Sequence, residues 1–245
     1  MSPSALFRPF SADAIVGLCD HALLHPNLTD ADLQAQLQAL RPYPVASVCI
    51  KPYAVAMAVE ALAGTAIGVG TVIGFPHGSP KSAVKAAEAE AAFGDGAREV
   101  DMVINVGKAL SGDWAFVRED IAAVLAVARG HGGLIKVIFE TDFLPGDAVK
   151  IRLCEICSDL GADYVKTSTG FGYVKQPNGQ FATTGATGHD VELMRRHCPS
   201  SVGVKPSGGV RTLDDVLRYV ELGATRIGTT ATLAIHREAL ERFGR

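Results

Sequence analysis

Glu-Val-Asp-Met-Val-Ile-Asn, at residues 99–105, is a short and almost continuous apolar run with a charged residue in its interior. Strands that are covered on both faces have this pattern, as in a parallel sheet with helices on either side. Seven similar runs precede and follow it in the chain. We therefore expect eight strands, at residues 15–19, 45–50, 66–73, 99–104, 134–140, 164–166, 202–205 and 224–228.

Helical stretches separate these runs. We expect helices over residues 30–40, 114–129 and 147–160, and another that begins with Ser79 as its cap and Pro80 in its first turn. A further helix opens at a capping-box sequence that starts with Thr212, and Gly223 ends it. Eight strand–helix units in 245 residues give about 31 residues per unit, which suits a closed barrel. The sequence therefore predicts one α/β domain over residues 1–245, a (β/α)8 TIM barrel.

The alternative α/β architecture is an open, doubly wound sheet. That fold places a glycine-rich fingerprint directly after its first strand. Here the first expected strand is followed by Asp-His-Ala-Leu-Leu at residues 20–24, without a glycine. The barrel is therefore the preferred interpretation.

Composition limits the classes of function. The chain has 48% hydrophobic residues, enough for one large core, and a net charge of −3. It has no basic excess to attract nucleic acid or an anionic membrane, so we expect neither partner. Residues 1–10 contain no secretory signal or membrane-spanning apolar run, and the five cysteines are loosely spaced. We therefore expect a cytoplasmic protein.

Charged residues within or after the apolar runs indicate where a site lies. In a barrel, the carboxyl ends of the strands form the mouth of the active site. The residues that we expect there are Asp20, Lys51, Asp101, Asn105, Lys136, Glu140, Lys166, Lys205, Gly228 and Thr229. Lysine and aspartate are rarely buried without a partner, so these charges must pair inside the barrel.

Two interpretations of the buried lysines remain open. A salt-bridge network that only fills the barrel explains any one of them equally well. However, Lys166 and Lys205 end neighbouring expected strands, where each disfavours the protonation of the other. A lysine that loses its proton in an apolar pocket is a nucleophile toward a carbonyl. The convergence of three lysines with Asp101 favours this chemistry.

Glycine-rich turns after the last two strands predict an anion site. Gly208 and Gly209 follow the seventh strand, and Gly228, Thr229 and Thr230 end or follow the eighth. Backbone N–H groups in such turns bind phosphate at a helix N-terminus, the usual phosphate position in barrel enzymes. The alternative is two ordinary turns with glycine for positive φ.

The loop after the sixth strand reads Lys-Thr-Ser-Thr-Gly-Phe-Gly at residues 166–172. Thr169 and Gly170 in this loop can close over the same anion. Alternatively, the hydroxyl groups of the loop bond to its own backbone.

Together these motifs closely resemble the deoxyribose-phosphate aldolase family. The resemblance covers nearly the whole chain, from residue 19 to residue 230. Its specific segments are Val-Cys-Ile-Lys-Pro at 48–52, Gly-Phe-Pro-His-Gly at 74–78, the run at 99–105, Val-Lys-Thr-Ser-Thr-Gly-Phe-Gly at 165–172 and Val-Lys-Pro-Ser-Gly-Gly-Val-Arg-Thr at 204–212.

The resemblance implies a carbon–carbon lyase that cleaves 2-deoxy-D-ribose 5-phosphate reversibly to acetaldehyde and D-glyceraldehyde 3-phosphate, in deoxyribose catabolism. It implies that Lys166 forms a Schiff base, that Lys205 tunes it and that Asp101 relays protons, with no cofactor and no metal. The expected partners are the sugar phosphate, the aldehydes and a second copy of the chain in a dimer. The expected substrate- and phosphate-binding residues are Asp20, Thr169, Gly170, Gly208, Gly209, Gly228, Thr229 and Thr230.

The chain departs from the family pattern in four places. Residues 173–184 extend the loop after the sixth strand, Pro206 follows the tuning lysine, and Ala231 stands where a second serine is common. The chain also lacks the terminal tyrosine of some members. These departures keep one alternative open, a barrel that uses the same lysine on another phosphorylated or free aldose. A sugar-phosphate-binding protein without catalysis is a second alternative, from another class of function.

Several cysteines and histidines are expected to hold no metal. Cys154 and Cys157 lie one turn apart in an expected helix, without a second pair, and are expected to be buried thiols. His21 and His77 are expected in loops at the mouth, without the spacing of a metal-binding pair. His21 and Asp20 are instead expected to orient the sugar.

Overall fold

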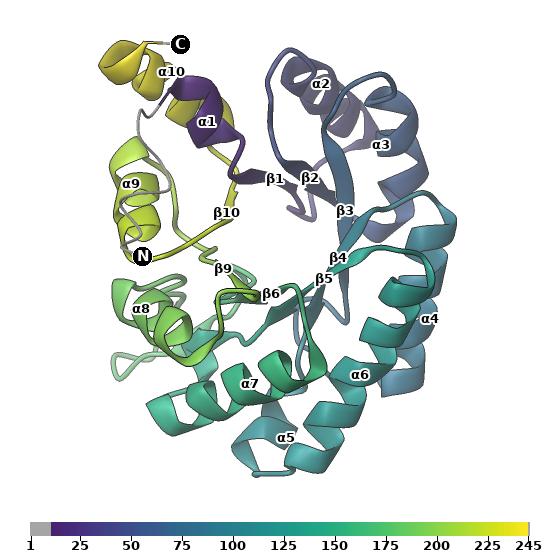
Figure 1. The fold of residues 1–245 in the computed structure, drawn as a ribbon, viewed down its shortest axis with the longest axis vertical. Helices are drawn as coiled ribbons and strands as arrows, with labels where there is room; N and C mark the ends of the chain where they lie inside the picture. Colours follow the sequence, from purple (N-terminus) through teal and green to yellow (C-terminus); the bar gives the residue numbers. More distant parts are fainter. Residues whose placement is uncertain (1–10, 245) are drawn as a thin grey trace.

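Eight strands lie side by side, all parallel, in the order β10-β1-β2-β3-β4-β5-β6-β9. The strands are β1 (Cys19–Leu23), β2 (Ser47–Ile50), β3 (Gly68–Ile73), β4 (Glu99–Val103), β5 (Leu134–Ile138), β6 (Tyr164–Lys166), β9 (Gly203–Lys205) and β10 (Ile227–Thr229). A parallel bridge between Ser207 and Gly228 joins the two ends of this sheet, so the barrel closes. The computed structural model, which describes residues 11–244, thus confirms the predicted TIM barrel (Figure 1).

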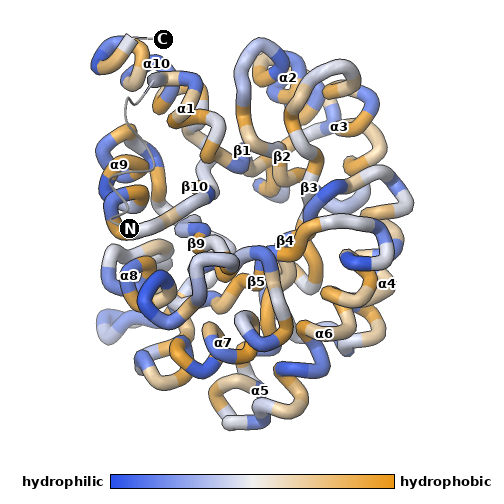
Figure 2. The backbone as a smooth tube through the Cα atoms, viewed as in Figure 1, coloured by the Kyte–Doolittle hydropathy of each residue, from blue (hydrophilic) through white to orange (hydrophobic). Residues whose placement is uncertain are grey.

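Helices surround the ring of strands (Figure 1). They are α1 (Ala12–Val16), α2 (Asp30–Leu40), α3 (Val55–Ala61), α4 (Ser82–Gly94), α5 (Val106–Leu110), α6 (Trp114–Gly130), α7 (Asp147–Leu160), α8 (Gly188–His197), α9 (Leu213–Glu221) and α10 (Thr232–Phe243), with short 3-10 turns η2 (Pro52–Ala54) and η3 (Thr141–Phe143). Apolar and polar stretches alternate along the helices (Figure 2), the pattern of helices with one buried face. Leucines such as Leu33 and Leu37 of α2 are fully buried, and they belong to a core that is built from apolar residues of the helices and the strands.

Local sequence signals fix several helix ends as predicted. The observed bounds of α2 and α7 equal the expected ranges. Thr212 and Asp215 form the predicted capping box of α9, in which each side chain bonds to the backbone of the other residue. Gly161 ends α7 with a left-handed φ of 74°, a conformation that glycine adopts without steric cost.

The prediction for the first strand, at residues 15–19, is wrong. Ile15 and Val16 belong to α1, which the side chain of Ser11 caps by accepting a hydrogen bond from Ala14 N at 3.2 Å. A five-residue apolar run does not distinguish a buried strand from a buried helical turn. Here the Ser11 cap and the packing of α1 against α10 stabilise the helical conformation. As a result, Asp20 lies within β1 instead of after it.

The helix expected to begin at Ser79 and Pro80 starts two residues later, at the beginning of α4, and no side chain caps it. Its first hydrogen bonds run to the carbonyl of Lys81, for example from Val84 N at 2.8 Å. The preceding loop packs tightly against the backbone after β4, since a Cβ on Gly78 would lie 1.7 Å from the Ile104 carbonyl oxygen. This tertiary contact holds the chain in a loop past Pro80. The last strand also starts later than expected, at Ile227 instead of residue 224.

The extension at residues 173–184 forms a small antiparallel hairpin of β7 (Val174–Lys175) and β8 (Phe181–Ala182), between β6 and α8. At its base, one carboxylate oxygen of Asp142 accepts hydrogen bonds from Thr184 N at 2.5 Å and Gly185 N at 3.1 Å. These bonds tie the hairpin to η3, which follows β5.

Residues 1–10, for which we expect no secretory signal, lie outside the described residues, as does Arg245. Across residues 11–244, none of the helices combines the length and apolar character needed to span a bilayer.

Candidate active site

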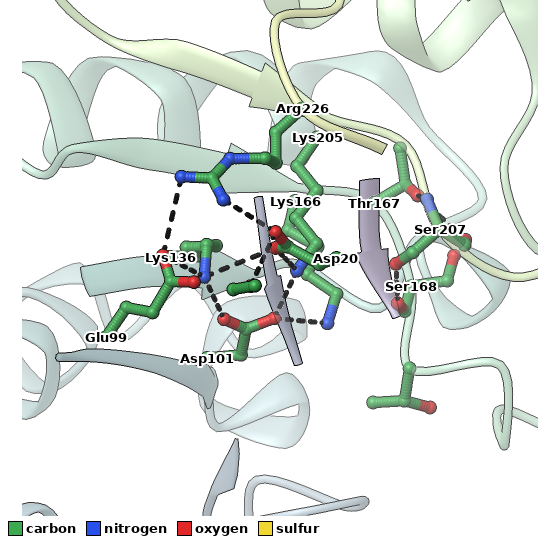
Figure 3. Close-up of polar contacts among 12 residues, drawn as sticks. Asp20, Glu99, Asp101, Lys136, Lys166, Thr167, Ser168, Lys205, Ser207 and Arg226 are labelled. Carbon is green, nitrogen blue, oxygen red and sulfur yellow. Dashed lines mark hydrogen bonds and ion pairs between the residues drawn. The ribbon is translucent and has the colours of Figure 1, made fainter. Parts of the chain in front are cut away.

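Seven charged side chains meet inside the barrel (Figure 3). Side chains along a strand point alternately to its two faces, which is why Glu99 and Asp101 of β4 both point inward. The members of this interior cluster are Asp20, Glu99, Asp101, Lys136, Lys166, Lys205 and Arg226. Six of them are at most 4% exposed, so their charges have to be compensated by one another.

Strand register brings charged residues of neighbouring strands together. Asp101 of β4 lies beside Lys136 of β5, and Lys166 of β6 lies beside Lys205 of β9. Lys166 and Lys205 are the last residues of their strands, whereas Asp101 and Lys136 lie in strand interiors. The two terminal lysines are therefore at the carboxyl end of the barrel, where TIM-barrel active sites lie.

Asp101 is the centre of the cluster. Its Oδ2 accepts hydrogen bonds from Lys166 Nζ and Lys205 Nζ, each at 2.7 Å, and its Oδ1 accepts one from Lys136 Nζ at 2.9 Å. Burial acts to raise the pKa of the Asp101 carboxyl, but the three lysines outweigh it and hold the pKa well below the usual 3.8. Asp101 is therefore a permanent anion at neutral pH.

Asp20 supports the cluster from β1. One of its oxygens bonds to Lys205 Nζ, and the other accepts from Ser47 Oγ and from the Arg226 guanidinium, each at 2.7 Å. Lys136 Nζ lies 3.3 Å from Asp20 and 2.9 Å from Glu99. Asp20 is thus shared between Lys205 at the mouth and the charges deeper in the barrel.

The three lysines differ in how well their charge is compensated. Among the described residues, Lys136 contacts three carboxylates, Lys205 two and Lys166 one. Burial and the nearby Lys205 lower the pKa of Lys166 from 10.5, against the opposing effect of Asp101. Burial acts to lower the pKa of Lys205 as well, but Asp101 and Asp20 raise it above 10.5. Lys166 is therefore the lysine that loses its proton first.

An open cavity of about 300 Å³ lies over Lys166 and Lys205. All the predicted site residues except Asp101, which lies beneath the two lysines, line it: Asp20, Lys166, Thr169, Gly170, Lys205, Gly208, Gly209, Gly228, Thr229 and Thr230. Gly228 leaves room for Lys205, because a Cβ there would lie 3.2 Å from Lys205 Cε. The structure thus brings predicted site residues from four strands and their loops to one cavity.

Four residues that line this cavity have backbone N–H groups without hydrogen-bond partners in the described part of the chain. Within residues 11–244, no such partner is found for the N–H groups of Gly170, Gly208, Gly209 and Thr230. Gly208 and Gly209 have φ values of 87° and 82°, a conformation that favours glycine. Thr230 directly precedes α10, whose N-terminus carries a partial positive charge. This arrangement suits an anion such as phosphate.

Hydroxyl groups of the loop after β6 bond to protein groups. Thr169 Oγ1 and Thr169 N both donate to the carboxylate of Glu140, and Thr167 Oγ1 donates to the Ser207 carbonyl at 3.1 Å. Glu140 has a left-handed φ of 58°, which ends β5 before residue 140. Burial raises the pKa of its carboxyl. In this loop the free donors are therefore backbone N–H groups such as that of Gly170, whereas the hydroxyl groups fix the loop.

Several residues expected at the mouth do not line the cavity, among them His21, Lys51 and Asn105. His21 is in β1 with its ring toward α10, where Nδ1 lies 3.0 Å from Thr232 Oγ1, because neighbouring strand residues face opposite sides. Burial lowers its pKa to about 4. Lys51 Nζ donates to the Leu28 carbonyl at 2.7 Å, and Asn105 caps α5. The expectation that His21 orients the sugar is therefore wrong.

Two residues of the site, Arg226 and Tyr173, were not predicted from the sequence. Arg226 precedes β10 and reaches Asp20 and Glu99, which are far away in sequence. Tyr173, at the start of the hairpin, lines the cavity although its ring is half exposed. The only sequence signal for Tyr173 was its place in the extension of the loop that follows Lys166, and no signal distinguished Arg226 from a surface arginine.

Cys154 and Cys157 lie in α7 as expected, and all five cysteines are buried free thiols. Within the described residues, no group of three or more His, Cys, Asp or Glu side chains is placed to hold a metal ion.

A cavity at the carboxyl end of a TIM barrel, lined by residues with backbone N–H groups that are unpaired within the described chain and by buried amines, defines the class of the protein as a barrel enzyme for small molecules. The model for the DeoC/LacD family aldolases matches residues 15–238, and the chain belongs to this family of lyases. The predicted family resemblance is thereby confirmed.

Similar proteins cover nearly the whole chain. The deoxyribose-phosphate aldolase of Rhodopirellula baltica is 45% identical over 227 residues, which are 93% of this chain and 90% of the relative. That of Streptococcus mutans is 48% identical over 216 residues, 88% of this chain and 92% of the relative. The tetrameric deoxyribose phosphate aldolase of Aeropyrum pernix has the same fold, with a TM-score of 0.82 and 28% identity, covering 95% of this chain and 94% of that one.

Proposed function

We propose that the protein is a deoxyribose-phosphate aldolase that works through a Schiff base on Lys166. The reaction is the reversible cleavage of 2-deoxy-D-ribose 5-phosphate to acetaldehyde and D-glyceraldehyde 3-phosphate, a step of deoxyribose catabolism. The names of the two bacterial relatives support the substrate. The observation that carries the mechanism is the position of Lys166, the least compensated of the three lysines in the interior cluster, at the floor of the cavity.

The reaction begins when Lys166 Nζ attacks the C1 aldehyde carbon of the open-chain sugar. Loss of water leaves a protonated imine, which draws electrons from the C2–C3 bond. As a base removes the proton of the C3 hydroxyl, this bond breaks, its electron pair forms an enamine, and C3 leaves as the aldehyde of glyceraldehyde 3-phosphate. Protonation of the enamine at C2 and addition of water release acetaldehyde and restore the amine.

Asp101 and Lys205 support these steps in our proposal. Asp101 compensates the positive charge of the imine, and its Oδ2 links the two amines across 2.7 Å hydrogen bonds, so a proton can pass between them. Lys205, whose pKa is raised, keeps a positive charge beside Lys166 and so disfavours its protonation. The phosphate lies on the N–H groups of Gly170, Gly208, Gly209 and Thr230, with Gly228 and Thr229 behind them, and holds the sugar in register with the amine.

Gly208→Ala is expected to weaken binding of the phosphorylated sugar. A Cβ at this position would lie 3.0 Å from Gly185 Cα, in a backbone with a φ of 87°. The turn must shift, and the loss of a charge-assisted hydrogen bond is expected to raise KM about 10- to 100-fold. Steady-state kinetics on deoxyribose 5-phosphate measure this rise. KM for unphosphorylated deoxyribose should hardly change.

Gly179→Ala is the matched control for this variant. Gly179 has a φ of 82°, but it lies at the hairpin tip with open space around its Cα. Gly179→Ala therefore measures only the cost of placing alanine in a left-handed backbone conformation. We expect it to leave KM unchanged. If Gly208→Ala raised KM equally for deoxyribose 5-phosphate and for free deoxyribose, the phosphate would not bind at this turn.

A comparison of the two sugars tests the proposed function directly. We expect kcat/KM for cleavage of deoxyribose 5-phosphate, measured through the glyceraldehyde 3-phosphate formed, to exceed that for free deoxyribose by at least about 100-fold, the effect of two to three anion hydrogen bonds. Equal rates would favour an aldolase for unphosphorylated aldoses. Binding of the phosphorylated sugar without cleavage would favour the catalytically silent alternative.

Assembly and location are parts of the same proposal. We propose a homo-oligomer built from dimers, for which the tetramer of the Aeropyrum pernix relative is the support. We propose a cytoplasmic location, for which the five free thiols are the support. Light scattering of the purified protein and fractionation of its source cells test the two statements, and a monomer or a secreted protein would contradict them.

A further inference from the structure

An ion pair closes the charged interior at the end opposite the cavity. Glu99 is the first residue of β4, and Arg226 directly precedes β10, so both lie at the amino ends of strands. Arg226 Nη2 lies 3.5 Å from Glu99 Oε2, and Arg226 Nη1 donates to Asp20 at 2.7 Å (Figure 3). Neither residue lines the cavity, so neither can touch a substrate there.

The backbone is built to hold this pair. Gly70 of β3 lies beside Glu99, where a Cβ would come within 2.9 Å of Glu99 Cγ. The Arg226 guanidinium lies over the ring of Tyr164 at 5.4 Å from its centroid, a favourable cation–π contact. Its side chain is only 13% exposed. A buried arginine with two carboxylate partners is a fixed positive charge.

Within the seven-residue interior cluster, the cations outnumber the carboxylates by one when every member is charged. The four cations are Lys136, Lys166, Lys205 and Arg226, and the three carboxylates are Asp20, Glu99 and Asp101. An excess charge is costly in a buried site. The excess is relieved most easily at Lys166, which has a single carboxylate partner among the described residues.

We propose that the balance of charge between Arg226 and Glu99 sets the protonation of Lys166: the Arg226 charge keeps Lys166 unprotonated for attack, and the Glu99 charge opposes this effect. Both are positioning residues that act through Asp20, Lys136 and Asp101. The inference rests on the proposed function, because it concerns the charge of the amine that forms the imine. It differs from the role of Lys205, which acts on Lys166 as a direct neighbour.

Other groups face Lys166 as well. Besides Asp101 and Lys205, these are Cys49 of β2 and Glu140 after β5, with Lys136 and Asp20 one step further. Burial raises the pKa of the Cys49 thiol to about 12, so it is uncharged. Glu140 is held by Thr169 at the rim. None of these groups is changed in the variants below. Differences between the pH profiles of the variants therefore reflect the charges of Glu99 and Arg226.

Arg226→Met tests the proposal, because methionine fills the space of the arginine stem without its charge. The interior then has three cations and three carboxylates, and Lys166 can stay protonated. A unit charge about 10 Å away at an effective dielectric constant of about 20 shifts a pKa by about one unit. We therefore expect the acid limb of the kcat/KM–pH profile to move up by about one pH unit, with about a tenfold loss along the limb.

The double variant Glu99→Gln/Arg226→Met supplies the decisive comparison. It removes one charge of each sign and restores the excess of one cation, so the acid limb should return to the wild-type position. Glu99→Gln alone leaves two excess cations, and its limb should move to lower pH. Arg129→Met is the matched control, since Arg129 bonds to Asp163 outside the barrel interior, and its limb should not move.

The same pH series is repeated with reductive trapping of acetaldehyde, whose rate reports the free amine of Lys166 directly. An unchanged limb in Arg226→Met, or a double variant shifted as far as the single one, would overturn the proposal. If Arg226→Met does not fold, the Glu99→Gln variant alone tests the proposal: a shift of its acid limb to lower pH supports the proposal, and no shift or a shift to higher pH contradicts it. An adduct on wild-type Lys166 keeps the proposed function intact in either case, whereas its absence would refute that function first.

Discussion

Lys166→Met is expected to lower kcat by at least about 10⁴-fold while the barrel stays folded, because the covalent route is lost with the amine. Methionine matches the length of the lysine stem and leaves no large cavity. Asp101 keeps Lys136 and Lys205 as partners, so no buried charge is left unpaired. Steady-state kinetics and thermal unfolding measure the two halves of this prediction.

Lys150→Met is the control for the loss of a buried lysine. Lys150 Nζ bonds to Asp190 at 2.6 Å between α7 and α8, outside the cavity. Its replacement should lower stability and leave kcat unchanged. Substantial turnover in a folded Lys166→Met protein would show that another group carries the chemistry.

Asp101→Asn is expected to damage both catalysis and stability. An amide provides no charge for the three lysines that contact this position. Breaking a buried ion pair by removal of one partner typically costs about 3–5 kcal/mol of unfolding free energy. We expect kcat to fall by about 10²- to 10⁴-fold, because both the counter-charge of the imine and the link between the amines are lost.

The pH dependence of the unfolding free energy tests the contribution of the Asp101 carboxylate. The folded-state pKa of Asp101 is depressed, so the group stabilises the fold above the pKa of about 3.9 in the unfolded chain. That contribution is lost as the pH falls through the lower folded-state pKa. The unfolding free energy of the wild type should therefore decrease below about pH 4, and Asp101→Asn should show a shallower decrease in urea titrations.

Asp190→Asn provides the matched comparison for this variant. Asp190 is a buried carboxylate that pairs with Lys150 and bonds to Thr187. Its replacement should lower the unfolding free energy without lowering kcat. An Asp101→Asn protein as stable and as active as the wild type would exclude Asp101 from the proposed cluster of functional charges.

The barrel was predictable because its strands are buried on both faces. The near-continuous apolar runs at β4, β5 and β6 have no other simple explanation in a chain of this length. The first strand was not predictable in the same way, since residues 15–19 have the composition of a strand and the cap of a helix. Its true position follows from the packing of α1 against α10, a contact between the two ends of the described chain.

The site was predictable where strand ends carry it. Lys166 and Lys205 end adjacent strands, and Asp101 is a charge inside an apolar run, so their convergence follows from the barrel alone. Arg226 was not predictable, because its partners Asp20 and Glu99 are 206 and 127 residues away. Likewise, the left-handed backbone of Glu140 depends on its contacts with the following loop.

Borohydride trapping in the presence of acetaldehyde tests the central claim most directly. Reduction of an imine fixes one ethyl group on the amine that formed it, and peptide mapping by mass spectrometry locates that amine. We predict a single ethyl group on Lys166 in the wild type and none in Lys166→Met. A wild-type protein without an adduct, or with its adduct on another lysine such as Lys205, would contradict the account.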